Sequence, residues 1–334
     1  MSIQPQAKCA DVGLQTSQRI GASRRVTLPT WPFNSLTSQT QLMNDTNFQN
    51  STTDESRGPG DGPRAAIQAA RSEAFRALHI PGSPLVLFNA WDVGSAQAIM
   101  ESGAEAIAVN AWTVAVAHGF DEVAHMPDDL YIGNLQRIAT SSHLPVTASL
   151  CGFHSACPSS IAEEVTRLLM AGAVGFSITD AVDSNGTLRD ISDQATLIST
   201  ARVAGDDVGV RPFLYARTEV FCQTWPDQHS EDMVEVAAER GCAFATAGAD
   251  SLFVPGLSDL RLIDRLVERS PLPVSVMIGD QATSIQELAR AGVACVTFGL
   301  LPYLKAMSAV RDEARAVLIL SSQAQRDWSQ VRSR

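Results

Sequence analysis

The sequence predicts an α/β fold of the (β/α)8, or TIM, barrel type, and three observations lead to this prediction. Short apolar runs suited to buried strands recur along residues 84–298. They begin in two ways that alternate strictly, one after a proline and the other after a small residue and a glycine. The prolines are spaced by roughly 60–70 residues, which accommodates two strand–helix units per interval and therefore eight strands in total.

Each predicted strand is a continuous apolar run, as expected for parallel strands that are covered on both faces. Four of the runs begin with the prolines, at 84–88, 145–149, 212–216 and 273–277. The other four occupy 106–109, 174–178, 251–254 and 295–298. An open doubly wound sheet is the competing arrangement, but eight regular units over roughly 240 residues favour closure into a barrel.

The segments between the runs are expected to be amphipathic helices. Before the fourth run, for example, Ile161, Val165 and Leu168 recur at helical spacing. A small residue and a glycine, as in Ala171-Gly172, then end the helix in a way that suits a left-handed C-terminal cap. The sequence contains no glycine-rich dinucleotide-binding motif and no P-loop that would favour another fold.

The chain divides into three regions by composition. Residues 1–63 are rich in Ser, Thr, Gln and Asn and end in the turn-forming run Gly58-Pro59-Gly60-Asp61-Gly62-Pro63, so we expect a disordered N-terminal extension and linker. Residues 64–322 should form the barrel, and residues 323–334 a polar C-terminal tail. The acid-poor start of the extension weakly resembles a mitochondrial transit peptide, whereas an untargeted extension is the simpler interpretation.

Charge and composition disfavour several classes of function. Thirty-six acidic against 25 basic side chains give a formal net charge of −11, which disfavours nucleic acid and anionic membranes as partners. No apolar segment has the length of a membrane span and no signal peptide is recognisable, so we expect a cytoplasmic protein. The six cysteines include no CxxC pair and indicate neither a zinc site nor a disulfide framework, and most should be buried thiols.

In a (β/α)8 barrel the functional side chains follow the carboxyl ends of the strands. In this sequence those positions are polar or aromatic in an organised way. In chain order the candidates are Trp91 and Asp92, Asn110 and Trp112, Glu122, Ser149 and Cys151, Thr179 and Asp180, and Arg217 and Glu219. Because all the carboxyl ends meet at one rim, we expect a single site there.

Arg217 is the strongest individual candidate, because a desolvated guanidinium between apolar runs requires an anionic partner. That partner is either a carboxylate of the substrate or a carboxylate of the protein itself, Glu219 or Asp180. Asp180 and Glu122 could act as acid, base or ligands of a hard divalent cation, or could instead cap helix N-termini. Trp112 could form the wall of a substrate pocket or pack in the core.

Several segments support a resemblance when they are taken together and in order. They are Leu87-Phe88-Asn89-Ala90-Trp91-Asp92-Val93-Gly94-Ser95-Ala96, Ala171-Gly172-Ala173-Val174-Gly175, Ala216-Arg217-Thr218-Glu219 and Leu252-Phe253-Val254-Pro255-Gly256. On the basis of these segments, roughly residues 75–307 resemble the isocitrate lyase and phosphoenolpyruvate mutase superfamily, in particular its small methylisocitrate lyase and oxaloacetate hydrolase branch.

The resemblance implies an enzyme that forms or consumes an enolate of a pyruvate-like or oxalate-like unit held on Mg2+. It implies that Arg217 holds the substrate carboxylate and that backbone amides around Asn110, Ala111 and Trp112 stabilise an oxyanion. It also implies a homodimer or homotetramer formed by exchange of C-terminal helices, for which residues 301–320 are suited.

The sequence departs from the family at the metal ligands. The acidic pair that the family has after the third strand is Ser149-Leu150-Cys151 here, and the pair after the fourth strand is Thr179-Asp180. The asparagine of the family's seventh strand is Ser275. We therefore expect any Mg2+ to bind weakly, through Asp180 and Glu122. Cys151 is either a replacement acid or nucleophile or an inert buried thiol.

We expect a lyase-like enzyme that cleaves or hydrolyses a C–C bond of a small oxo- or hydroxy-carboxylate. The alternatives are a metal-independent barrel enzyme for a larger, less charged metabolite and a catalytically silent relative that binds a metabolite or an active homologue. The expected catalytic residues are Arg217, Asp180, Glu122 and Cys151. The expected substrate-binding residues are Trp91, Asp92, Asn110, Ala111, Trp112, Ser149, Thr179, Glu219 and Ser275.

Overall fold

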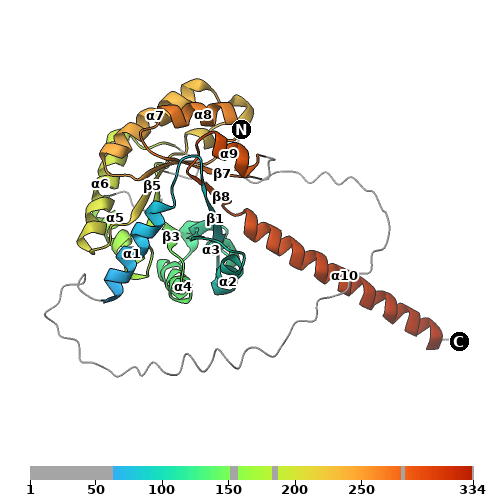
Figure 1. Ribbon diagram of the computed structural model, residues 1–334. Helices are drawn as coiled ribbons and strands as arrows, with labels where there is room; N and C mark the ends of the chain where they lie inside the picture. The colour runs from blue at the N-terminus through green and yellow to red at the C-terminus, as the bar shows by residue number, and fades with distance from the viewer. Residues whose placement is uncertain (1–62, 151–156, 183–186, 280–282, 333–334) are drawn as a thin grey trace, which may run out of the picture. The chain divides into compact units, whose positions relative to one another are not determined.

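A computed structural model describes residues 63–150, 157–182, 187–279 and 283–332 of the chain. Eight parallel strands close into a barrel in chain order, with β8 paired to β1 (Figure 1). The strands are β1 Leu85–Ala90, β2 Ile107–Val109, β3 Val146–Ser149, β4 Gly175–Thr179, β5 Phe213–Arg217, β6 Ser251–Val254, β7 Val274–Met277 and β8 Cys295–Thr297. The predicted (β/α)8 barrel is confirmed, and each predicted run overlaps one strand.

Helices connect the strands and surround the barrel (Figure 1). The described α-helices are α1 Pro63–Ala77, α2 Val93–Glu101, α3 Ala111–Ala117, α4 Asp128–Ser141, α5 Pro158–Met170, α6 Ile191–Asp207, α7 Glu231–Thr246, α8 Leu260–Arg269, α9 Ile285–Arg290 and α10 Leu301–Arg332. Short 3-10 helices lie in the loops at η1 Val123–His125, η2 Val220–Cys222 and η3 Pro226–Gln228. The predicted helical face of α5 is buried as expected, and Gly172 follows it with a φ of 104°, the left-handed conformation predicted from its position.

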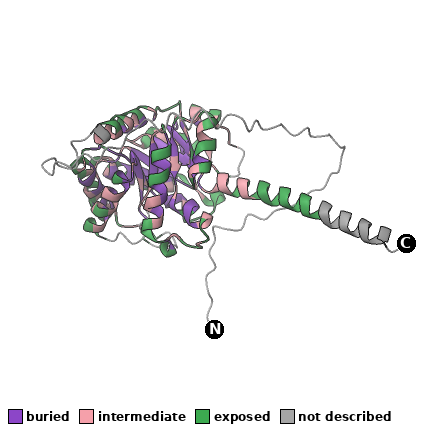
Figure 2. Cartoon of the chain, turned by 90° about the horizontal axis from the view of Figure 1, so that it is seen from below, coloured by how far each residue is buried: buried purple, intermediate pink, exposed green. Residues whose placement is uncertain are grey.

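Two layers of apolar side chains hold the barrel together. Because successive residues of a strand point to opposite faces, Val254 of β6 packs outward against the helices while Phe253 packs into the barrel. The outer layer is the larger and includes fully buried residues from strands and helices, such as Phe176 and Leu168. Figure 2 shows this burial running through the strands and the inner faces of the helices.

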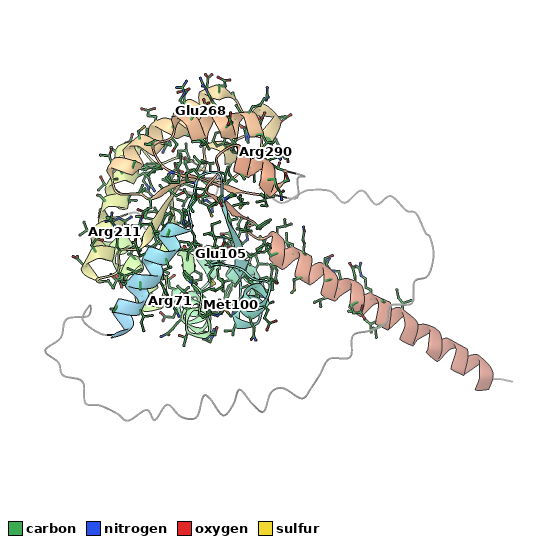
Figure 3. The ribbon with its side chains drawn as sticks, in the orientation of Figure 1. Arg71, Met100, Glu105, Arg211, Glu268 and Arg290 are labelled. Atoms are coloured by element: carbon green, nitrogen blue, oxygen red, sulfur yellow. The ribbon has the colours of Figure 1, made fainter. Side chains whose placement is uncertain are left out.

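Helix α1 covers the amino-terminal ends of β4 and β5. The hydroxyl of Ser72 on α1 lies 3.1 Å from the carbonyl oxygen of Val174 and 2.5 Å from that of Arg211, so one short polar side chain contacts the entry to both strands. Figure 3 labels Arg71 on α1 and Arg211 at the entry to β5. The end of the barrel opposite the predicted functional rim is thereby closed.

An aromatic cluster fills the barrel just inside α1. The ring centroids of Phe75 and His79 lie 5.5 and 4.0 Å from that of Phe213, the first edge to face and the second stacked. The Nδ1–H of His79 donates to the carbonyl of Phe75, so its Nε2 accepts a hydrogen bond from the hydroxyl of Tyr215. Burial lowers the pKa of His79 to about 4, so the ring is neutral at neutral pH, and the Phe75 carbonyl selects the tautomer that carries its proton on Nδ1.

The C-terminal helix α10 extends from the barrel (Figures 1 and 2). It runs to Arg332, so most of the predicted polar tail from residue 323 onward is helical. Several of its apolar side chains are exposed, among them Val310 and Val317, at 63% and 55%. On the barrel, Phe88 of β1 is 37% exposed and stacks on Phe298 after β8. An apolar helix stripe and an apolar patch on the barrel are thus both exposed in the single chain.

Some other sequence predictions lie outside the described residues, and one of them is wrong. The proposed extension, apart from Pro63, lies outside the described residues, and among the helices that are described none is long and apolar enough to cross a membrane. The expectation of mostly buried cysteines is wrong for the described part of the chain, where Cys157 and Cys242 are exposed, Cys222 is half-buried and Cys295 is buried. The exposed two belong to helix positions that face solvent, whereas Cys295 lies in a strand.

We predict that His79 makes the stability of the fold sensitive to acid. Burial among aromatic rings lowers the pKa of His79 from 6.5 to about 4. The unfolded chain therefore binds this proton from about pH 6.5 downward, whereas the folded protein binds it only near pH 4, so the stability gained from the neutral ring is lost as the pH falls through this range. The free energy of unfolding should fall by about 3 kcal/mol from this group between pH 7 and pH 4.

Chemical unfolding of the wild-type protein and of His79→Gln at several pH values tests this prediction. The variant should lose this part of the pH dependence, because glutamine does not titrate. An identical acid dependence in the two proteins would contradict the assignment.

Candidate active site

A cavity of about 60 Å³ lies at the carboxyl ends of the strands, and all eight strands contribute to its wall. Polar side chains at the rim include Asn89, Asn110, Ser149 and Arg217. The deeper wall consists of Leu87, Ala108, Thr147, Ser177, Tyr215, Phe253, Ser275, Met277, Cys295 and Thr297. A wider depression of about 640 Å³ lies on the outer faces of α5 and α6, away from the strand ends. The cavity at the strand ends is therefore the candidate site, at the place predicted from the sequence.

Arg217 is the last residue of β5 and contributes to the wall of this cavity. Its Nε donates to the carboxylate of Glu219, which also accepts a hydrogen bond of 3.2 Å from the hydroxyl of Thr179. The guanidinium lies over the ring of Phe253, 5.6 Å from its centroid. Among the described residues no hydrogen bond engages the two Nη groups, so a fixed guanidinium presents free donors to a ligand.

The ion pair determines the charge of the site. Burial acts to raise the pKa of Glu219, but the adjacent Arg217 guanidinium outweighs this, and the pKa lies below its ordinary value. Burial acts to lower the pKa of Arg217, but Glu219 outweighs this, and the pKa is raised. Both groups are therefore ionised at neutral pH, and the cavity wall carries a compensated pair instead of an excess positive charge.

Hydrogen bonds that involve side chains connect the ends of β2 and β3 at the rim. The backbone N–H of Ala111 donates to the hydroxyl of Ser149 at 2.9 Å, and Asn110 caps the first turn of α3 through its side-chain oxygen. The hydroxyl of Tyr131 lies 3.0 Å from the carbonyl oxygen of Val109 and 2.9 Å from that of Ser149. Three predicted residues, Asn110, Ala111 and Ser149, are thus brought together beside the cavity.

Asp180 is fully buried and does not contribute to the cavity wall. One of its oxygens accepts the backbone N–H of Glu219 at 2.9 Å, and the other accepts Nη1 of Arg240 at 3.1 Å. Arg240, on α7, also donates to the carbonyl of Arg189. Burial raises the pKa of Asp180 above its ordinary range, although the amide and the guanidinium oppose this. Asp180 joins the loop after β4 to α7 and to the segment that carries Glu219.

The predicted residues after β1 have local structural contacts. Asp92, predicted to bind substrate, caps α2 by accepting the backbone N–H of Ser95 at 2.7 Å. The ring of Trp91 packs edge to face on Tyr303 of α10, with 5.2 Å between centroids. Neither side chain contributes to the cavity wall.

The remaining predicted residues lie in different environments. Glu122 and Trp112 are exposed and lie outside the cavity wall. Ser275 does face the cavity, and its hydroxyl shares a hydrogen bond of 2.7 Å with Ser251. Cys151 lies outside the described residues.

Residues 75–318, which include the barrel and this site, match the phosphoenolpyruvate phosphomutase family. The chain belongs to this family. The resemblance to the isocitrate lyase and phosphoenolpyruvate mutase superfamily is thereby confirmed.

The alignments with similar proteins cover most of the barrel. The structure of a Burkholderia cenocepacia protein, provisionally assigned as a phosphonomutase, is 40% identical and superposes with a TM-score of 0.72 over 75% of this chain and 99% of that one. An uncharacterized Mycobacterium tuberculosis protein is 30% identical over 254 residues, 73% of this chain and 88% of its own length. Oxaloacetate decarboxylase 2 of Pseudomonas fluorescens is 26% identical over 206 residues, 59% of this chain and 67% of its own.

The superfamily resemblance implies Mg2+, and the described residues do not form a site that fits it. Mg2+ is usually held through carboxylates, but Ser149 and Thr179 occupy two of the matching positions. Asp180 has both oxygens in hydrogen bonds, and Glu122 is exposed. Within the described ranges no three side chains of His, Cys, Asp or Glu are close enough together to hold a metal ion.

Sequence reasoning missed most of the deeper cavity wall. Thr147, Tyr215 and Cys295 lie within apolar runs and not after them, so a search of the strand ends does not reach them. The alternation of side chains along a strand could have found Thr147, because the neighbouring residues Val146 and Ala148 both pack outward.

We predict that the Asp180–Arg240 pair stabilises the fold strongly. Arg240→Met should lower the free energy of unfolding by about 3–5 kcal/mol, because it leaves a buried carboxylate without its cation. Arg265→Met is the matched control, since Arg265 forms an exposed pair with Glu268 and should change stability by less than about 1 kcal/mol. Urea unfolding of both variants measures the difference, and equal effects would contradict a structural role for Asp180.

Proposed function

We propose that this protein is a lyase-like enzyme that acts on a small oxo- or hydroxy-carboxylate through an enolate-type intermediate. The observation that carries the proposal is Arg217, which is held by Glu219 and Phe253 and presents free Nη donors at a cavity of about 60 Å³. A planar guanidinium with two parallel donors is suited to bidentate binding of a carboxylate. Family membership and the similarity to an oxaloacetate decarboxylase support a reaction at a carbon next to a carbonyl.

The proposed division of roles follows from the contacts. Arg217 holds the substrate carboxylate, and the amide of Trp112 is the proposed donor to the oxygen on which negative charge develops when the C–C bond breaks. The Ala111 amide donates to the hydroxyl of Ser149, which fixes the start of α3 beside the cavity. Asp180 is proposed as a positioning residue, since it binds the Glu219 amide and Arg240. Cys151, directly after β3, stays the proposed proton donor.

The cavity is large enough for a small substrate of this kind. A volume of about 60 Å³ holds roughly four to six water-sized groups, which corresponds to a molecule of a few carbon and oxygen atoms. We further propose that the carboxylate binds without a divalent cation, because hydroxyls replace carboxylates at the matching positions Ser149 and Thr179.

We predict that Arg217→Ala weakens the binding of oxalate, a stable mimic of the enolate, by about 10- to 100-fold, because charge-assisted hydrogen bonds are lost. Arg217→Lys should give an intermediate affinity, since it keeps the charge without the bidentate geometry. Arg261→Ala is the matched control, because the Arg261 side chain is 89% exposed on α8. Isothermal titration calorimetry measures the affinity of oxalate for the wild type and the three variants. An unchanged affinity in Arg217→Ala would overturn the proposal.

The same titration in EDTA and in Mg2+ tests the proposed independence of metal. Oxalate binding should be equal in the two buffers. Binding only in Mg2+ would overturn that part of the proposal. An absence of oxalate binding in both buffers, with no turnover of small oxo-acids, would favour a catalytically silent relative.

We also propose that the protein is a homodimer or homotetramer in which α10 packs on a second copy. On α10, Tyr303, Met307, Val310 and Val317 recur at intervals of three or four residues or their multiples and form one stripe. On the barrel, Phe88 is exposed and its stacking partner Phe298 is half-buried. Burying an apolar stripe of one chain on an apolar patch of another would remove both from water.

We predict that the double variant Val310→Glu and Val317→Glu is a folded monomer, because both side chains are exposed in the single chain but would be buried in the assembly. The control is Asp312→Lys, which lies on the other side of α10 and should leave the assembly intact. Light scattering coupled to size-exclusion chromatography gives the mass. A monomeric wild type, or a double variant of unchanged mass, would contradict the proposed assembly.

A further inference from the structure

Two serine side chains lie next to each other on the wall of the cavity. Ser149 of β3 and Ser177 of β4 are paired in the parallel register, and both contribute to the wall. The neighbours of Ser177 in the strand, Phe176 and Ile178, are buried in the outer apolar layer, so Ser177 points into the barrel. Ser177 is nevertheless half-buried and not fully buried, because the surface that it retains opens into the cavity.

Both serines have a hydroxyl proton that no described residue accepts. The Ser177 hydroxyl has no hydrogen-bond partner among the described residues and, unlike that of Thr147, it is not fully buried. The Ser149 oxygen accepts the Ala111 amide at 2.9 Å, but this bond leaves the O–H of Ser149 itself without an acceptor in the described part of the chain. The pair therefore offers two adjacent donors to a ligand in the cavity.

The pair lies one inward position deeper than Arg217, on the same side of the barrel. Arg217 is paired with Thr179, which comes two residues after Ser177 on β4. Two residues along a strand correspond to roughly 6–7 Å. Because β3, β4 and β5 are consecutive strands, Ser149, Ser177 and Arg217 line one continuous part of the wall.

This spacing suits a carboxylate that has an oxygen atom on the adjacent carbon. The guanidinium would bind the carboxylate and the hydroxyls would bind the second oxygen, each through hydrogen bonds of roughly 2.7–3.0 Å. Two such bonds, with the two neighbouring oxygens between them, span the depth of one inward position. A carbonyl or hydroxyl oxygen accepts these bonds, whereas a methylene or methyl group at the same place leaves both donors unpaired.

The other polar side chains of the wall are engaged or lie elsewhere. Asn89 donates to the carbonyl of Gly299 at 2.6 Å, and Ser275 shares a hydrogen bond of 2.7 Å with Ser251. Thr297 of β8 is half-buried, and its hydroxyl has no partner among the described residues. However, β8 lies four strands from β4, on the opposite side of the eight-stranded barrel.

We infer that Ser149 and Ser177 together bind an oxygen on the carbon next to the substrate carboxylate. Ser177 thereby distinguishes 2-oxo- and 2-hydroxy-carboxylates from carboxylates that lack this oxygen. The inference rests on the proposed role of Arg217 in holding the carboxylate. It adds Ser177, which lies within β4 and not after it, to the substrate-binding residues.

The test uses the full chain and two probes in calorimetry, glycolate and propanoate, which differ only by a hydroxyl in place of a methyl group next to the carboxylate-bearing carbon. The wild-type protein should bind glycolate about tenfold more tightly than propanoate, because a ligand oxygen pairs two otherwise unpaired donors. Ser177→Ala should reduce this preference to about threefold or less. Its melting temperature should stay close to that of the wild type, since the Ser177 hydroxyl has no partner among the described residues.

Thr297→Val is the matched control, because it removes an unpartnered hydroxyl from the opposite side of the same wall at nearly constant shape. This variant should keep the wild-type preference for glycolate. No preference in the wild type, an unchanged preference in Ser177→Ala, or an equal loss of preference in Thr297→Val would overturn the inference.

The outcomes separate this inference from the proposed function. If oxalate binds in an Arg217-dependent manner but Ser177→Ala keeps the preference for glycolate, the role of Ser177 is wrong and the carboxylate site stands. If neither oxalate nor either of the two probes binds the wild-type protein, the proposed function and the role of Ser177 both fail.

Discussion

The candidate site depends on a series of buried charged side chains, alternating in sign and linked by hydrogen bonds, that ends at Arg217. Arg240 on α7 binds Asp180, Asp180 binds the backbone amide of Glu219, and the Glu219 carboxylate binds Arg217. Two cations and two anions are thereby paired, which is the condition under which charges can be buried without a large desolvation cost. The same contacts fix the guanidinium of Arg217 relative to the helix shell and leave its terminal donors free for a ligand.

The two ends of the barrel have different physical roles. At the amino-terminal end, α1 and the rings of Phe75, His79 and Phe213 form a closed aromatic packing in which the one titratable ring is held neutral. At the carboxyl end, polar side chains surround a small cavity. Tyr215 belongs to both, because its hydroxyl binds His79 while its side chain contributes to the cavity wall. The amino-terminal end is thus closed by packing, whereas the carboxyl end keeps space for a ligand.

Acidic side chains at the strand ends illustrate how one residue type takes different roles. Asp92, Asp180 and Glu219 all follow strands in the sequence, yet the first caps a helix, the second binds an arginine of α7 and the third holds Arg217. Glu122, by contrast, is exposed to solvent. None of these four carboxylates shares a cluster with two others among the described residues, so their number alone says little about metal binding. Hydrogen-bond partners decide the role of each group.

The sequence by itself determined the barrel, the approximate positions of its strands and the rim at which Arg217 lies. These follow from local regularities: apolar runs, glycines after helices, and a charged residue at a strand end. Only the tertiary structure decided that Asp180 turns toward Arg240 and that Ser149 binds the Ala111 amide. These contacts join residues that are 38 and 60 positions apart, and pairing over that range is set by the closure of the barrel and not by any local pattern.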